Sequence, residues 1–394
     1  MNELAQNIVD TLFEILPNQT SFPLHEPFFN GNEKEYLMEC INSRFVSSVG
    51  KYVDKFEKML AEYTGAKHAI AVVNGTAALH IALKLADISS EDEVLVPSLT
   101  FVGTANAIAY CGATPHFIDS NINTLCLDVE KLDNYLEKIT RVANNTCINK
   151  LTNKKIKAII PVHIFGHPAD MEPLMDLCDK YHLKVVEDAA ESIGSYYKGR
   201  HTGNFGIASA ISFNGNKTIT TGGGGAVLCN NLALAEKARH ISTTARSDKD
   251  WHPFHDQIGF NYRMPNINAA LGCAQIEQLP DILKKKRLLA KKYNDKLNKI
   301  KGISFLWEPD HSQSNFWLNT LMLDKADPEL LNQILKLTNK NGILTRPVWT
   351  PLHKLPMYRH SPAMDLSSVE KLENRIINIP SSKNLGDENR GYQV

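Results

Sequence analysis

Residues 208–225 read ASAISFNGNKTITTGGGG, which is an apolar segment followed by a polar turn and four consecutive glycines. The apolar part, residues 208–213, is predicted to be a buried strand. Lys217 lies between this strand and the glycines, so its amine is presented to a site while the nearby backbone stays open to a ligand. This setting is typical of a Schiff-base lysine, although a solvated loop lysine would share the same local sequence.

A second element precedes this stretch by about thirty residues. Residues 184–190 read KVVEDAA, an apolar strand that ends in two carboxylates. Because side chains alternate along a strand, Glu187 and Asp188 face opposite sides and only one of them need enter a site. Ligands of parallel α/β sheets bind at the carboxyl ends of the strands. A carboxylate there can pair with the pyridinium nitrogen of pyridoxal phosphate and keep the ring an electron sink.

A third element is suited to binding a phosphate. Residues 68–73 are predicted to form a buried strand, residues 74–76 a turn, and residues 77–85 a helix. The first amides of a helix lack partners and carry partial positive charge, so an anion docks there readily. Gly75 would allow close approach and Thr76 would add a hydroxyl, although a plain helix-capping turn would have the same sequence.

With these three elements in this order, the chain resembles the pyridoxal phosphate-dependent sugar aminotransferases of the DegT/StrS type. The resemblance runs over residues 28–381, which is nearly the whole chain. It implies the α/β fold of aspartate aminotransferase, known as pyridoxal phosphate fold type I. A large α/β domain with a mostly parallel central sheet would then be followed by a smaller C-terminal α+β domain.

The resemblance also implies roles for particular residues. Lys217 would be the covalent attachment point of the cofactor, and Asp188 would face its pyridine nitrogen. The cofactor phosphate would be held by Gly75, Thr76 and Ser212, and Phe101 would stack on the ring. Asn261, in the run GFNYRM at residues 259–264, would reach the phosphate of a neighbouring subunit. A homodimer with shared active sites is therefore expected.

Two positions depart from the commoner family pattern. Glu191 stands where many members have a glutamine that faces the phenolic oxygen of the cofactor, and Asn214 stands where many have histidine. A carboxylate beside a phenolate would be repelled unless it were protonated or turned away. Together with RPVW at residues 346–349 and LHKLPMY at residues 352–358, these departures resemble the subgroup from legionaminic-acid and bacillosamine pathways.

This narrower resemblance implies the substrates. Glutamate would donate the amino group, and the acceptor would be the 4-keto group of a UDP-linked 4-keto-6-deoxy-N-acetylhexosamine. The product would be a 4-amino sugar for a surface glycan. Arg346, His353 and Tyr358 are candidates for sugar or diphosphate contacts, and His163 is a candidate for the pocket wall. Arg346 and His353 could equally tie the small domain to the large one.

Other functions are less consistent with the sequence. Relatives that dehydrate deoxy sugars carry histidine at the lysine position, so Lys217 argues against a dehydratase. A non-catalytic, cofactor-binding regulatory protein stays open, as does an aminotransferase for substrates other than sugars. Residues 215–218 resemble the end of a nucleotide-binding P-loop, but Asn216 and Ile211 stand where that motif has glycine. His163 and His167 have no carboxylate at ligand spacing, so no metal is expected.

Composition limits the partners and the compartment. The 43 basic and 43 acidic residues balance, which gives no indication of nucleic-acid binding. Seven cysteines at irregular spacing, without a C-x-x-C pair, argue against disulfides and structural zinc. The first residues lack a signal-peptide pattern, and no apolar run is long enough to span a membrane. A cytoplasmic enzyme is the expectation.

Alternating strand and helix patterns predict the domain organisation. We expect an N-terminal helical segment at residues 1–25, a large cofactor-binding domain at 26–272, and a connecting helix with a small domain at 273–394. The first helix, residues 3–15, is expected to lie across a partner or the large domain, and the connecting helix to span about 275–299. In the small domain, strands at 316–323 and 343–348 should flank a helix at 328–337. The Asn-rich segment 140–153 is interpreted as a surface loop.

Overall fold

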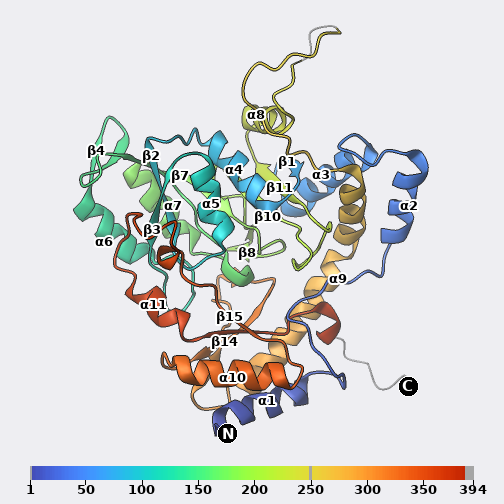
Figure 1. Ribbon diagram of the computed structural model, residues 1–394, viewed down its shortest axis with the longest axis vertical. Coiled ribbons are helices and arrows are strands. Elements are labelled where there is room, and N and C mark those ends of the chain that lie inside the picture. Colours follow the sequence, from blue (N-terminus) through green and yellow to red (C-terminus); the bar gives the residue numbers. More distant parts are fainter. Residues whose placement is uncertain (1, 248–250, 387–394) are drawn as a thin grey trace.

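The computed structural model describes residues 2–247 and 251–386, and its centre is a nine-stranded sheet (Figure 1). The order along the main path is β1-β11-β10-β7-β6-β2-β3. The strands from β10 to β3 are mutually parallel, whereas β11 runs antiparallel to both of its neighbours. The bounds of these strands are β1 His68–Val72, β2 Asp92–Pro97, β3 Thr114–Ile118, β6 Lys155–Ile159, β7 Lys184–Asp188, β10 Ala208–Ser212 and β11 Gly225–Cys229. The predicted α/β fold with a mostly parallel sheet is confirmed.

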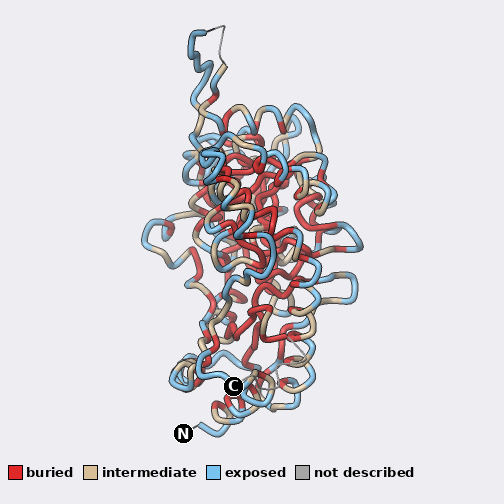
Figure 2. The backbone as a smooth tube through the Cα atoms, turned by 90° about the vertical axis from the view of Figure 1, so that its right-hand side faces the viewer, coloured by how far each residue is buried: buried red, intermediate tan, exposed pale blue. Residues whose placement is uncertain are grey.

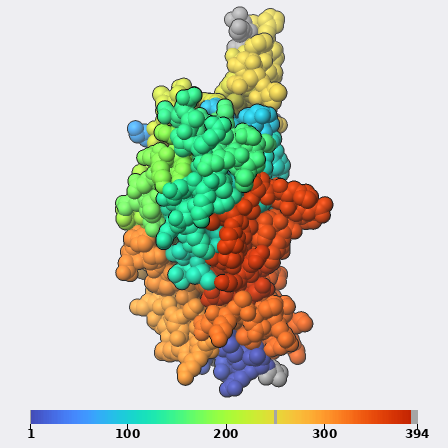
Figure 3. All heavy atoms as spheres, turned by 90° about the vertical axis from the view of Figure 1, so that its left-hand side faces the viewer, coloured from blue at the N-terminus to red at the C-terminus, as the bar shows by residue number. Residues whose placement is uncertain are grey.

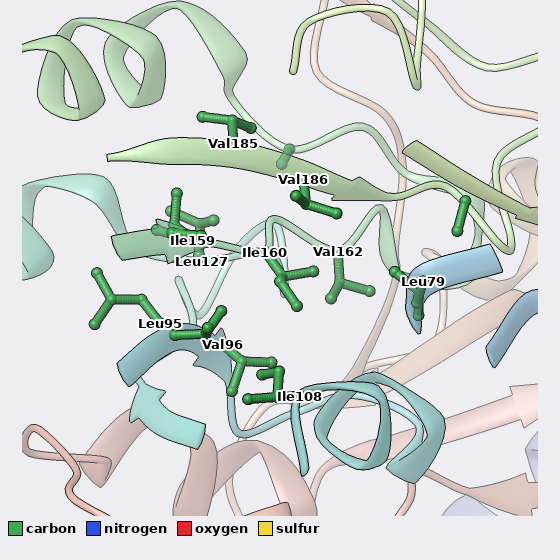
Figure 4. Close-up of a cluster of buried hydrophobic side chains, with 14 of the residues drawn as sticks. Leu79, Leu95, Val96, Ile108, Leu127, Ile159, Ile160, Val162, Val185 and Val186 are labelled. Atoms are coloured by element: carbon green, nitrogen blue, oxygen red, sulfur yellow. The ribbon is translucent and has the colours of Figure 1, made fainter. Parts of the chain in front are cut away.

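Helices cover both faces of this sheet because its strands are apolar on both sides. Along β1, Ile70 and Val72 belong to the core cluster that contains helix α4, whereas Ala69 and Ala71 belong to the cluster that contains α3 and α9. Figure 4 shows part of the first cluster, where side chains of neighbouring strands meet those of α4 and α5. On this second face α3 packs directly on β1, and α9 packs on α3.

The helices match the alternating pattern read from the sequence. Their bounds are α1 Glu3–Ile15, α2 Glu33–Ser43, α3 Lys51–Thr64, α4 Gly75–Leu85, α5 Val102–Tyr110, α6 Val129–Ile139, α7 Met171–Tyr181, α8 Leu232–Ser242, α9 Asn266–Leu297, α10 Pro328–Lys340 and α11 Ser367–Glu373. The connecting helix α9 starts nine residues earlier than expected and continues through Pro280. None of the helices in the described ranges is long and apolar enough to cross a membrane.

A smaller layer follows α9 and contains a four-stranded sheet in the order β12-β14-β16-β15. Its strands are β12 Ile303–Phe305, β14 Asn319–Leu323, β15 Arg346–Pro347 and β16 Ile376–Ile379. The strands expected at 316–323 and 343–348 are therefore shorter than predicted. Residues 351–373 then pass back over the edge of the large sheet, where Phe117 pairs with Ala363 (Figure 3).

One of the two alternatives for the N-terminal helix is wrong, and so is the interpretation of residues 140–153; that this helix lies across a partner stays a prediction. Helix α1 packs on α9 and α10, and its buried Ile8 and Leu12 belong to the core cluster of the small layer (Figure 1). It therefore does not lie across the large domain. The segment 140–153 is not a plain loop, because β4 Thr140–Ala143 and β5 Thr146–Asn149 form a hairpin that joins the edge of β6.

Residues 246–247 and 251–258, between α8 and α9, extend away from the body of the molecule (Figure 2). The described residues near the tip of this segment are exposed, including Trp251 and Ile258. The remaining short strands β8 Tyr196–Tyr197, β9 Arg200–His201 and β13 Ser312–Gln313 form a third, three-stranded sheet.

Candidate active site

A cavity of about 560 Å³ lies where β7 and β10 end and where the small layer meets the large one. The large layer contributes the ends of these strands, the lysine loop and the first turns of α4 and α5. The small layer contributes Trp317, Leu318 and residues 346–349. The residues from the sequence prediction that line it are Gly75, Thr76, Phe101, Asp188, Glu191, Ser212, Lys217 and Arg346. Eight positions spread over 272 residues of sequence are thus brought to one cavity.

Lys217 points into this cavity from the loop between β10 and β11. The loop is closed by backbone bonds from Phe213 to Gly224 and from Lys217 to Asn214. The lysine side chain is 13% exposed, and its Nζ lies 3.3 Å from Glu191 Oε1. Its ammonium also sits 3.8 Å from the centre of the Trp317 ring. A carboxylate and an aromatic face therefore hold the amine in place.

Asp188 is the carboxylate that enters the cavity. It is buried, and Thr104 donates a 2.7 Å hydrogen bond from Oγ1 to Asp188 Oδ2. Burial raises the pKa of Asp188, and the bonds from Thr104 and from the Ala190 amide oppose that rise. A cation placed at this carboxylate would relieve the cost of burying it.

Glu187 faces the other side of the sheet, as strand alternation predicts. Its carboxylate accepts hydrogen bonds from the amides of Gly203, Phe205 and Gly206. His163 Nε2 lies 3.1 Å from it, while the Ala169 amide donates to His163 Nδ1. The Glu187 carboxylate therefore has a structural role, because these bonds hold the segment that follows Asp188.

The opposite end of the cavity is formed by the start of α4. Asn74 caps this helix by accepting a bond from the Ala77 amide, which leaves Gly75 and Thr76 at its first two positions. Helix geometry gives the amides of these two residues no partner within the helix. A methyl group added at Gly75 would lie 2.8 Å from the Ser212 Cβ, so only glycine fits between the helix and β10. The arrangement is a cradle for an anion.

Aromatic side chains form the wall between these two ends. Phe101, the N-cap residue of α5, is 51% exposed although it lines the cavity. Trp349 stacks on Phe165 with ring centres 5.3 Å apart, and its ring lies 6.2 Å from that of Phe101. Arg346 lies at the exposed side of this group. A flat ring bound over Phe101 would cover the exposed aromatic face.

Four of the predicted site residues lie outside the lining of this cavity. His163 is fully buried against Glu187. His353 Nδ1 lies 2.7 Å from Ser98 Oγ, and the Tyr358 hydroxyl donates to Asn106 Oδ1. The last two bonds tie the C-terminal segment to the large layer. Asn261 is exposed in a bridge to Thr243, so it does not contribute to the cavity of its own chain.

Comparison with known proteins shows the family to which the chain belongs. The profile of the DegT/DnrJ/EryC1/StrS aminotransferase family matches residues 28–392. The chain belongs to this family of sugar aminotransferases. It is 39% identical to the GDP-perosamine synthase of Escherichia coli O157:H7 over 378 residues, which cover 93% of this chain and 94% of the relative. It is 30% identical to the spore coat polysaccharide biosynthesis protein SpsC of Bacillus subtilis (strain 168), with 93% of each chain covered.

A solved structure gives the same result. Helicobacter pylori PseC, an aminotransferase involved in the biosynthesis of pseudoaminic acid, superimposes with a TM-score of 0.81 at 28% identity. The superposition covers 92% of this aminotransferase and 94% of PseC. The protein is therefore a transaminase of pyridoxal phosphate fold type I, and its cofactor is pyridoxal phosphate.

The cavity of this aminotransferase fits that cofactor. The amine of Lys217 and the carboxylate of Asp188 lie in one cavity with the anion cradle of Gly75, Thr76 and Ser212. These are the groups needed for a carbonyl, a protonated ring nitrogen and a phosphate. The half-exposed ring of Phe101 offers a face for the pyridine ring.

Three residues of the site were missed in the sequence. Thr104 orients Asp188, and Trp317 packs on Lys217 while its indole nitrogen donates to the Asn216 carbonyl over 2.6 Å. Neither had a local signal, because each acts through a residue at least 84 positions away in the sequence. A third, Trp349, lies inside the quoted run at 346–349, where its place in the wall could have been suspected.

Proposed function

We propose that this aminotransferase moves an amino group from glutamate to the 4-keto group of a nucleotide-linked 4-keto-6-deoxyhexosamine. The observation that carries the proposal is the grouping of Lys217, Asp188 and the exposed Arg346 around one cavity. The lysine and the aspartate serve the cofactor, while the guanidinium is placed at the open side, where a diphosphate could be bound by two parallel hydrogen bonds. The 4-amino product would enter a surface glycan.

Lys217 and its neighbours would each have a separate part in the transfer of the amino group. Bound pyridoxal phosphate supplies an electron sink that stabilises negative charge on the substrate carbon. Lys217 would hold the cofactor covalently, and its amine, once released by the amino donor, would move the proton at the substrate carbon. Trp317 and Glu191 keep that amine inside the cavity. Because the keto acid formed from the amino donor would leave before the keto sugar binds, ping-pong kinetics are expected.

Asp188 sets the charge of the cofactor ring. Its carboxylate would pair with the protonated ring nitrogen, and this pairing would oppose the rise in its pKa that burial causes. Thr104 donates to Oδ2 and the Ala190 amide donates to Oδ1, so the carboxylate is held in one orientation while its oxygens keep the capacity to accept a further bond from the ring. The cavity wall of Leu24, Val348 and Trp349 limits the access of water to this ion pair.

For the sugar, we propose a UDP-linked substrate with an N-acetyl group, as in the legionaminic-acid and bacillosamine pathways. The support is the run RPVW at residues 346–349, which lines the cavity with one cation and apolar side chains. The methyl of an acetamido group would pack on an apolar surface such as Val348 and Trp349. The relatives named GDP-perosamine synthases favour a second candidate, a GDP-linked sugar with a hydroxyl at carbon 2.

One assay separates these candidates. The purified protein with pyridoxal phosphate and glutamate would be given the UDP-linked N-acetylated 4-keto sugar and, separately, the GDP-linked 4-keto sugar. A kcat/KM at least about tenfold higher for the UDP substrate is expected, since one buried apolar group contributes about 1–3 kcal/mol of discrimination. A preference for the GDP sugar would refute the proposal that the substrate carries UDP and an N-acetyl group. Conversion of simple keto acids alone would refute sugar specificity altogether.

We also propose that the active unit is a homodimer with shared sites. Helix α2 and the segment after it carry four exposed large apolar side chains within residues 38–49, those of Met38, Ile41, Phe45 and Val49. Exposed apolar patches of this kind are typical of an interface. Because Asn261 lies outside the cavity of its own chain, a second copy of the chain is the occupant that gives it access to a cofactor phosphate.

A further inference from the structure

Glu191 is the residue of the cavity whose role the family resemblance left open. It follows β7 by three positions and is buried, with both carboxylate oxygens engaged. Oε1 lies 3.3 Å from Lys217 Nζ, and Oε2 accepts a 2.8 Å bond from the Phe165 amide. Phe165 is itself fixed in a left-handed conformation, with φ of 54° and its ring stacked on Trp349. The carboxyl group is therefore held toward the lysine and is not turned away.

The charges around Glu191 are few. Lys217 is the cation that faces it, and Asp188 is a second carboxylate in the same cavity. Burial raises the pKa of the Cys126 thiol, and the charges of Asp170 and Glu191 add to that rise. Burial raises the pKa of Glu191; the Lys217 charge and the Phe165 amide oppose the rise, and Asp188 adds to it. The ionised form of Glu191 thus depends on the ammonium of Lys217.

Covalent attachment of the cofactor to Lys217 changes the charges that act on Glu191. Lys217 Nζ forms a C=N bond to the aldehyde carbon, and the aldehyde oxygen leaves as water with two of the three ammonium protons. The third proton stays on nitrogen. The phenolic oxygen of pyridoxal phosphate sits on a ring carbon next to the one that bears this group, and the family resemblance places position 191 opposite that oxygen. The 3.3 Å between Lys217 Nζ and Glu191 Oε1 is consistent with that placement. An ionised Glu191 would then stand beside a phenolate.

We propose that Glu191 takes up one proton from solvent when Lys217 becomes linked to the cofactor, and that it then donates a hydrogen bond to the phenolic oxygen. In the cofactor-free protein the same side chain is the carboxylate partner of the Lys217 ammonium. The inference rests on the proposed function only through its cofactor and needs no particular sugar. A glutamine at this position would donate the same bond without any change of protonation.

The consequence is a pH dependence of cofactor binding. If binding takes up one proton, the dissociation constant for pyridoxal phosphate rises by about tenfold per pH unit where Glu191 is ionised in the free protein. Glu191→Gln should remove this component and leave the absorption band of the lysine-linked cofactor in place. The protonation of the cofactor itself is common to both proteins and cancels in the comparison.

The test is calorimetry with pyridoxal phosphate as titrant. Cofactor-free wild type and Glu191→Gln would be titrated near pH 8 in buffers of different ionisation enthalpy, which gives the number of protons taken up. We expect wild type to take up about one proton more than the variant. Glu172→Gln, which changes a surface carboxylate paired with Lys198, should behave as wild type. Equal proton uptake by wild type and Glu191→Gln would overturn the proposal.

A second measurement uses the wild type alone, in case the variant does not fold. Infrared difference spectra of protein labelled with carboxyl-¹³C glutamate should show a protonated glutamic acid after pyridoxal phosphate is added. A spectrum with carboxylate bands alone would overturn the proposal. Failure of sugar amination in a protein that passes both tests would count against the proposed substrate and not against Glu191.

Discussion

At the scale of single residues, the site depends on Asp188 and on the hydroxyl that orients it. Asp188→Asn keeps the size of the side chain and removes the charge, so the ring nitrogen would no longer be held protonated. We expect kcat to fall by about 10²-fold or more, within the range for a lost acid–base interaction. Thr104→Val, which removes the 2.7 Å bond to Asp188 and the 3.2 Å bond between the Thr100 and Thr104 hydroxyls, should cost about tenfold or less. Steady-state kinetics with glutamate measure both, and an Asp188→Asn enzyme as active as wild type would contradict the assignment.

Residues of the site were predictable from the sequence where their neighbours along the chain define them. Lys217, Asp188 and Gly75 each follow a buried strand, so strand periodicity and turn chemistry place them at one sheet edge. The pairing of His163 with Glu187 was not predictable, because it joins positions 24 residues apart through a helix and a strand. A histidine at the end of a strand has the same local sequence whether it lines a pocket or satisfies a buried carboxylate.

At the scale of elements, the glycine-rich stretch serves packing as well as chemistry. A methyl group added at Gly225 would lie 2.5 Å from the backbone of Asn74, where β11 meets the start of α4. Gly225→Ala should therefore destabilise the protein by about 1–3 kcal/mol, as overpacked sites do. At Gly215, in the same stretch, an added methyl meets nothing within 4 Å. Gly215→Ala is the matched control, expected within about 0.5 kcal/mol of wild type by urea unfolding.

The hairpin of β4 and β5 shows why one element was missed. Ala143 pairs with Thr146, and the two residues between them, Asn144 and Asn145, have φ of 48° and 55°. Two left-handed residues in a two-residue connection make the turn that best suits a hairpin, and asparagine is one of the few residues that tolerate it. The Asn-Asn pair was thus a readable signal, which the polar composition of the segment concealed.

Helix α9 carries a buried lysine whose effect on stability depends on pH. Lys286 donates hydrogen bonds to the carbonyls of Trp317 and Ser381, and burial lowers its pKa from 10.5 to about 7. Between these values the unfolded chain binds a proton that the folded protein has released. The free energy of unfolding therefore rises with pH from about 7 to about 10.5, by about 5 kcal/mol in all.

This pH dependence is measured as the difference between wild type and Lys286→Met, because the other groups that titrate in this range cancel. Urea unfolding at several pH values should show wild type gaining stability relative to the variant as pH rises. A constant difference between pH 7 and 10 would mean that Lys286 keeps its proton in the fold and is satisfied as an ammonium by the two carbonyls.

At the scale of the whole molecule, the layers were predictable and their mutual packing was not. The strands of the large sheet could be predicted, since the apolar pattern of each segment indicates by itself that the segment is buried. The place of α1 was decided by the fit of Ile8 and Leu12 to the core of α9 and α10, a long-range match with no local signature. The cavity exists only because the small layer returns Trp317 and residues 346–349 to the end of the large sheet.

The proposed homodimer leads to a prediction that would not hold if each active site were complete within one chain. If Asn261 of one chain serves the cofactor of the other, a Lys217→Ala chain and an Asn261→Ala chain are each impaired alone. A hybrid of the two contains one site with both defects and one site with neither. Half of randomly re-formed dimers are hybrids, so mixing equal amounts after mild dissociation should restore roughly a quarter of wild-type activity. Activity of the mixture that stays at the mean of the separate variants would show that each site is complete within its own chain.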